Sequence, residues 1–135
     1  MTRIWERLFI GSFSDAEELA ADNPHGITTV VSLSEVAVQC KRNDVKYVHL
    51  PIEDDEPVLV RQFYGIMDAI RKNIRWGTVL LHCAQGVSRA PSMAAAYIDS
   101  VGCKGIDAAL GEIRKARPFI HPSTELLESL RRHLV

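Results

Sequence analysis

The sequence centres on the loop His82-Cys83-Ala84-Gln85-Gly86-Val87-Ser88-Arg89. An apolar β-type run precedes this loop at residues 78–81, and a helical pattern follows it, because apolar residues between Ala90 and Val101 fall on one face at 3.6-residue spacing. The cysteine therefore lies at the end of a predicted strand, and the arginine lies in the first turn of a predicted helix. A loop of small residues placed there can turn several backbone N–H groups toward one point, at the positive end of the helix dipole. The pattern predicts an anion site with a thiol at its base.

The residue types in this loop suit attack on a phosphate ester. A helix N-terminus and a neighbouring arginine favour the charged form of a thiol, so we expect Cys83 to act as a thiolate nucleophile. Arg89 offers a planar fork of donors that fits two phosphate oxygens. Gly86 allows the backbone conformation that the curl requires, and Ser88 can cap the helix and donate its hydroxyl to the thiolate. Together these parts indicate a cysteinyl-phosphate intermediate.

The motif Cys-x5-Arg, preceded by His and with Gly at the third position of the loop, resembles the signature of the cysteine-dependent protein tyrosine phosphatases. The version found here is most similar to that of the small dual-specificity phosphatases, and the resemblance covers the chain from Leu8 to about Leu130. It implies hydrolysis of phosphotyrosine, and of phosphoserine and phosphothreonine, in proteins or peptides. It also implies that His82 orients the loop from behind. The residues expected to bind the phosphate or another oxyanion are Ala84, Gln85, Gly86, Val87, Ser88 and Arg89.

A general acid is needed to protonate the leaving oxygen. Four carboxylates stand together in an acidic loop after Pro51, and they are Glu53, Asp54, Asp55 and Glu56. In the phosphatases that this chain resembles, the acid is an Asp that follows a strand ending in a Pro-Ile-like pair. The matching position here is Asp54. Asp55 is the alternative, because the length of this loop varies.

The sequence departs from the phosphatase pattern directly after the arginine. That position usually carries Ser or Thr, whose hydroxyl helps the cysteine to leave when water attacks the intermediate, whereas this chain has Ala90. We therefore expect slow breakdown of the intermediate. In the alternative, Ala90 simply suits the helix ahead of Pro91, and Ser88 or Ser92 supplies the hydrogen bond.

Composition places limits on cofactors, partners and compartment. The chain has 135 residues, an apolar fraction of 47% and a net charge of −1, so nothing in it calls for nucleic acid or a membrane. Three cysteines, one of them needed as a thiolate, favour a reducing, cytoplasmic environment. No His, Asp or Glu spacing suggests a metal, so we expect no metal and no cofactor. We expect a monomer, with Arg114, Lys115 and Arg117 on a solvated face or in contact with phosphopeptides.

Strand and helix patterns alternate first and then give way to helices, which predicts an α/β fold. We expect residues 1–135 to form a single phosphatase catalytic domain, with three layers around a central, mostly parallel sheet flanked by helices. The predicted elements are strands at 8–10, 27–33, 45–50 and 78–81, and helices at 15–21, starting at Ser14 or Asp15, at 58–74, from residue 90, around 106–113 and from an N-cap at Ser123.

Two other functions compete with a phosphoprotein phosphatase. One is a phosphatase of phosphoinositides or RNA 5′-phosphates, but Ala84, Gln85 and Val87 supply no lysine for additional phosphates. The other is a phosphate-binding pseudophosphatase with weak turnover, for which Ala90 is the support. An intact Cys83 and Arg89 argue against it.

Overall fold

The central strands of the sheet are largely buried on both faces, as the mostly apolar runs at residues 27–33 and 78–81 predict. The computed structural model describes residues 1–134. Its elements in chain order are β1 (Thr2–Trp5), β2 (Leu8–Gly11), α1 (Phe13–Glu18), β3 (Ile27–Ser32), β4 (Lys46–His49), α2 (Val60–Ile74), β5 (Thr78–His82), α3 (Arg89–Gly102), α4 (Ile106–Ala116) and α5 (Thr124–His133). Within this part of the chain, no helix combines the length and the apolar character needed to cross a membrane.

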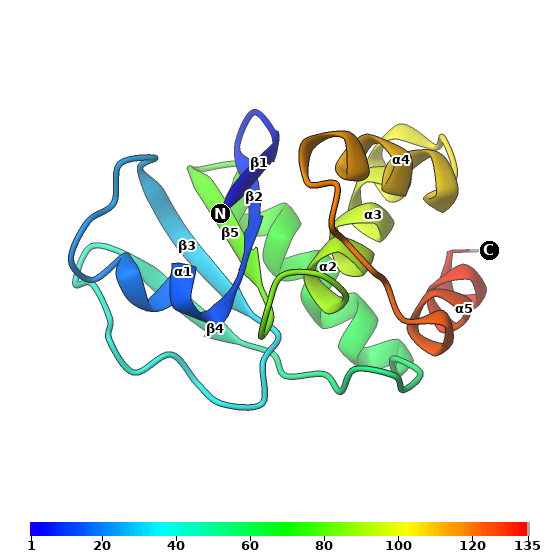
Figure 1. Ribbon diagram of the computed structural model, residues 1–135, viewed down its shortest axis with the longest axis horizontal. Helices are drawn as coiled ribbons and strands as arrows, with labels where there is room; N and C mark the ends of the chain where they lie inside the picture. Colours follow the sequence, from blue (N-terminus) through cyan, green and yellow to red (C-terminus); the bar gives the residue numbers. More distant parts are fainter. Residues whose placement is uncertain (135) are drawn as a thin grey trace.

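The strands form one five-stranded sheet in the order β1-β2-β5-β3-β4. The β2, β5, β3 and β4 strands run parallel, and β1 is an antiparallel edge strand beside β2. The strand β5 is therefore central, with β2 and β3 on its two sides (Figure 1). The prediction of an α/β fold around a mostly parallel sheet is confirmed.

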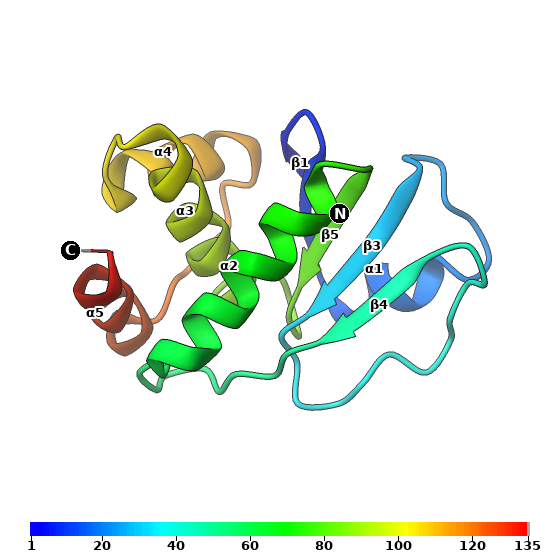
Figure 2. The ribbon, with the colours of Figure 1, turned by 180° about the vertical axis from the view of Figure 1, so that it is seen from behind.

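Alternating side chains of the strands feed two separate cores. In β5, Val79 and Leu81 join the core beneath helices α2 to α5, whereas Leu80 joins the smaller core beside α1. Figures 1 and 2 show the same arrangement, with α1 on one side of the sheet and α2 on the other. A central strand that is buried on both faces reads as a continuous apolar run, which is why residues 78–81 carry no polar alternation.

The largest differences from the predicted elements concern α1 and β1, whereas other bounds shift by at most three residues. Helix α1 begins at Phe13 rather than at residue 15, because Ser12 is its N-cap and forms a capping box with Asp15. The Ser12 hydroxyl accepts the Asp15 N–H at 3.1 Å, and the Asp15 carboxylate accepts the Ser12 N–H at 2.9 Å. The strand β1 was not predicted. It is four residues long, and its pairing with β2 stabilises it.

The carboxyl ends of the parallel strands place three loops at one edge of the sheet. The loop after β5 contains Cys83, the loop after β3 contains Glu35, and the loop after β4 contains Asp54. Backbone hydrogen bonds hold these segments together, since Leu33 N–H donates to His82 O at 2.9 Å and Ile52 N–H donates to Leu33 O at 3.1 Å. The candidate site forms where the three loops meet.

Candidate active site

The loop between β5 and α3, residues 83–88, is here called the anion loop. Each of its six carbonyl groups accepts a hydrogen bond from a residue outside the loop. The donors are His82 Nδ1 for Cys83, the Phe13 N–H for Ala84, the Arg117 side chain for Gln85 and Gly86, the His121 N–H for Val87, and the Ser92 N–H and hydroxyl for Ser88. Among residues 1–134, the N–H groups of residues 84–88 have no acceptor. The carbonyl groups point outward and are hydrogen-bonded, so the N–H groups of the loop remain available to bind an anion.

Arg117 is the side chain that holds the middle of this loop. Its Nε donates to Gly86 O at 2.9 Å, its Nη2 to Gln85 O at 3.4 Å and its Nη1 to Thr2 Oγ1 at 2.6 Å. Arg117 is 7% exposed, and its guanidinium stacks over the ring of Phe119 at 4.5 Å. The prediction that Arg117 belongs to a solvated face is wrong, because it lies just beyond α4, where the chain turns back beneath the anion loop. Arg114 and Lys115 are exposed as expected.

Gly86 is the point at which the loop admits no side chain. Its φ is +71°, and a Cβ there would lie 2.7 Å from the Gly11 carbonyl and from Arg117 Nη2. The backbone conformation and the close approach both require glycine. The sequence predicted the need for an unusual backbone conformation at Gly86, but not the close approach of Gly11 and Arg117.

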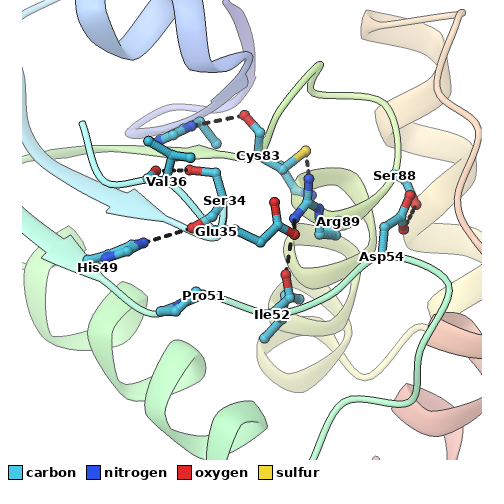
Figure 3. Close-up of polar contacts among 12 residues, drawn as sticks. Ser34, Glu35, Val36, His49, Pro51, Ile52, Asp54, Cys83, Ser88 and Arg89 are labelled. Atoms are coloured by element: carbon cyan, nitrogen blue, oxygen red, sulfur yellow. Dashed lines mark hydrogen bonds and ion pairs between the residues drawn. The ribbon is translucent and has the colours of Figure 1, made fainter. Parts of the chain in front are cut away.

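The thiol of Cys83 lies at the base of the anion loop. Cys83 is 2% exposed, and its Sγ accepts the backbone N–H of Ala90 at 3.4 Å, at the start of α3 (Figure 3). Ser88 stands at the N-cap position of α3, but its side chain makes no capping hydrogen bond. Its hydroxyl donates to Asp54 Oδ1 at 2.7 Å and accepts the Ser123 N–H at 3.0 Å. The expectations that Ser88 caps α3 and donates to the thiolate are therefore wrong, since these two partners hold its hydroxyl elsewhere.

His82 lies fully buried behind the loop, as the strand position predicts. Burial, the main cause, lowers the pKa of the His82 imidazole below its ordinary value of 6.5, so the ring is neutral at pH 7. A carbonyl only accepts, so Nδ1 carries the proton that it donates to Cys83 O at 3.0 Å. The other ring nitrogen, Nε2, accepts the Ser32 hydroxyl at 2.7 Å. These contacts fix both the ring and the backbone of Cys83.

The guanidinium of Arg89 faces the loops that follow β3 and β4. Its Nη1 donates to Ile52 O at 3.0 Å and to Glu35 Oε1 at 2.6 Å (Figure 3). The Arg89 side chain is 7% exposed, whereas the Glu35 side chain is 61% exposed. Sequence reasoning missed Glu35. The only signal for it was its position just after a predicted parallel strand.

Asp54 is the carboxylate of the acidic loop that reaches the anion loop, through its contact with Ser88 (Figure 3). Asp55 takes the left-handed conformation of the turn, with φ at 61°. Glu53 and Glu56 line a groove of about 490 Å³ beside the site, together with Glu35. The structure thus brings Cys83, Ser88, Arg89 and Asp54 together and adds Glu35 and Arg117 around them.

Comparison with known proteins finds proteins that are similar to this chain in sequence and in fold. Residues 8–134 match the family described as "Dual specificity phosphatase, catalytic domain". The chain is 29% identical over 132 residues to "Dual specificity protein phosphatase 18" of Rattus norvegicus, covering 96% of this chain and 65% of that relative. The chain thus spans a little under two thirds of that relative's length.

Two solved structures show how far the fold agrees. The crystal structure of human DUSP28 superposes with a TM-score of 0.87 at 23% identity, covering 99% of this chain and 95% of the other, which is a likeness of fold. The crystal structure of a mouse putative dual specificity phosphatase complexed with zinc tungstate superposes with a TM-score of 0.86 at 25% identity, covering 98% of this chain and 84% of the other.

Proposed function

The chain belongs to the family of dual specificity phosphatase catalytic domains, and on that premise we propose that it is a cysteine-dependent phosphoprotein phosphatase. It hydrolyses phosphotyrosine, and also phosphoserine and phosphothreonine, through a cysteinyl-phosphate intermediate. One observation supports this proposal above all. The carbonyl groups of the anion loop already accept hydrogen bonds, whereas, in the part of the chain that the structure describes, the N–H groups of residues 84–88 are free to bind the phosphate oxygens above Cys83 Sγ.

In the first step the Cys83 thiolate attacks phosphorus, and an S–P bond forms as the bond from phosphorus to the ester oxygen breaks. The loop N–H groups and Arg89 stabilise the charge on the three non-bridging oxygens. Asp54, protonated for this step, gives its proton to the departing oxygen. Its contact with Ser88 keeps the carboxyl at the rim of the loop.

In the second step a water molecule attacks the cysteinyl phosphate. Asp54, now ionised, takes a proton from that water, an O–P bond forms, and the S–P bond breaks to release inorganic phosphate and the Cys83 thiolate. The hydrogen bond that the structure gives the sulfur is from the Ala90 N–H. The hydroxyl of Ser92 donates to Ser88 O at 2.6 Å and so does not reach the sulfur.

Phosphoproteins suit this rim better than polyphosphorylated lipids or RNA ends. Three carboxylates, Glu35, Glu53 and Glu56, line the groove beside the loop, and a second phosphate placed there would meet like charge. The substrate is a single phosphate on a protein or peptide. The charge of that phosphate is met by backbone N–H groups and Arg89, so the proposal needs no metal ion and no cofactor. The protein acts as a monomer in the reducing cytoplasm, without nucleic acid or a membrane, where Cys83 stays a free thiol.

One assay tests this proposal. Wild type should release phosphate from an aryl phosphate and from phosphotyrosine and phosphothreonine peptides, and Cys83→Ser should release none while still binding tungstate. Arg89→Lys should be severely impaired, because an ammonium cannot reproduce the planar fork. Turnover by Cys83→Ser, or a preference for inositol phosphates over phosphopeptides, would contradict the proposal.

A further inference from the structure

We propose that Glu35 is a positioning residue, which selects the edge of the Arg89 guanidinium that meets the phosphate. The inference rests on the proposed function, since it concerns how the same site holds its anion. One nitrogen of the Arg89 guanidinium contacts two acceptors at once.

That nitrogen is Nη1, and it carries two hydrogens. Ile52 O accepts one at 3.0 Å and Glu35 Oε1 accepts the other at 2.6 Å. The carbonyl is part of the folded frame, because Ile52 is 3% exposed and its own N–H donates to Leu33 O. With both hydrogens taken, Nη1 has nothing left to offer a substrate.

The rest of the guanidinium remains available. Neither Nε nor Nη2 of Arg89 has a partner among residues 1–134, and neither is sealed from solvent. These two nitrogens form the parallel pair of donors that fits two oxygens of one phosphate. Occupying Nη1 therefore presents the Nε–Nη2 edge, and the two acceptors together fix the rotation of the planar group.

Glu35 can do this because the backbone on both sides of it is anchored. The Ser34 hydroxyl, which is buried, donates to Val36 O at 2.8 Å. His49, the last residue of β4, contacts Ser34 O through its Nε2 at 2.7 Å. Figure 3 shows Ser34 and His49 on one side of Glu35, with Arg89 on the other. The neighbouring strands β3 and β4 thus hold the segment that carries Glu35, whose carboxylate reaches Arg89.

A carboxylate beside a phosphate-binding arginine could instead compete with the phosphate. The two roles predict effects of opposite sign. Removing a competitor strengthens anion binding, whereas removing a positioning group weakens it. The contact with Nη1, away from the open edge, favours positioning.

The experiment measures tungstate binding by calorimetry in the Cys83→Ser background, and KM and kcat for an aryl phosphate in the active enzyme. Glu35→Ala should weaken tungstate binding about fivefold, which is near the upper end for a pair whose carboxylate is largely exposed. It should also raise KM more than it changes kcat. The tungstate affinity of Glu35→Gln should fall between those of the protein with Glu35 and of Glu35→Ala, because the amide oxygen still accepts a hydrogen bond from Nη1 but carries no charge. Glu112→Ala is the control. It removes a half-exposed carboxylate of α4 that pairs with Lys104, just before that helix, at 2.8 Å, and it should change neither quantity.

Unchanged or tighter tungstate binding in Glu35→Ala would overturn the inference. Equal losses in Glu35→Ala and Glu112→Ala would also overturn it, because they would reflect overall charge alone. If wild type binds tungstate but hydrolyses no phosphate ester, the proposed function fails, while weaker binding in Glu35→Ala still supports the positioning role.

Discussion

The back and the front of the anion loop are built in different ways. Behind it, His82 and Arg117 are nearly or fully buried and donate to carbonyl groups of the loop. In front of it, Asp54 and Glu35 are exposed carboxylates on loops, and each makes a single contact with the site. Behind the loop, buried side chains therefore satisfy the carbonyl groups with hydrogen bonds, whereas in front of it charged side chains are open to solvent.

Because of this difference, we expect residues behind the loop to affect both stability and activity, and residues in front of it to affect activity alone. A buried donor that is lost leaves a carbonyl without a partner, which costs about 1–3 kcal/mol, so changes at the back should lower both stability and activity. An exposed carboxylate contributes little to stability, so changes at the front should lower activity alone.

Among changes at the front and the back of the loop, the largest effect is expected at the front, from Asp54→Ala. If Asp54 is the general acid, kcat should fall by ~10²–10⁴ on poor leaving groups and by less on activated aryl phosphates, which need less protonation. The thermal midpoint should not change. Comparing a series of aryl phosphates by leaving-group pKa measures this effect, with Asp55→Ala as the control. If Asp55→Ala shows the leaving-group dependence and Asp54→Ala does not, the acid is Asp55.

At the back, Arg117→Met should lower kcat/KM by about 10²-fold, the loss expected when a reacting group is misplaced by ~1 Å. It should also lower the free energy of unfolding, because the Gly86 and Gln85 carbonyls lose their donor. Steady-state kinetics and urea unfolding measure the two quantities, and Arg114→Met, an exposed change on α4, is the control. A variant that keeps full stability but loses activity would break the division between back and front.

Between the two regions lies Ala90, which contacts the sulfur through its N–H. Breakdown of the intermediate should be slow, so rapid mixing of wild type with an aryl phosphate should show a burst of leaving group. Ala90→Ser should speed that step roughly ten- to a hundredfold, because a hydrogen bond to a charged group contributes about 1.5–3 kcal/mol. The first step should barely change. If wild type shows no burst and Ala90→Ser keeps the same kcat, another group assists the departure of Cys83.

The smallest effect concerns pH and His82. Its pKa is lowered in the folded protein, chiefly by burial, so below the ordinary value of 6.5 the unfolded chain binds a proton that the folded chain does not. The free energy of unfolding should therefore fall as pH drops below about 6.5 and be fully recovered above it. Urea unfolding at several pH values measures the slope, and His82→Asn should flatten it. An unchanged slope in that variant would assign the acid sensitivity to other groups.

The sequence alone determined the local parts of this site. The apolar run at 78–81, the small-residue loop and the helical pattern after Arg89 are each readable within a few residues, and the structure has Cys83 at the end of β5 and Arg89 as the first residue of α3. The N-cap at Ser123 was also predicted, and its hydroxyl accepts the Leu126 N–H. Such features follow from spacing and propensity over one or two turns of chain, so they need no tertiary information.

Only the tertiary structure decided which distant side chains reach the loop and what its own hydroxyls contact. Arg117 is 31 residues from Gly86, and Glu35 is 54 residues from Arg89. Nothing in the local pattern distinguishes Arg117 from its exposed neighbours, because its burial depends on where α4 ends relative to the loop. Likewise Ser88 turns toward Asp54 rather than the sulfur because the loop after β4 and the segment before α5 both arrive beside it. Parallel strands bring their carboxyl ends to one edge of a sheet, but which residues of the following loops make contact there is set by packing.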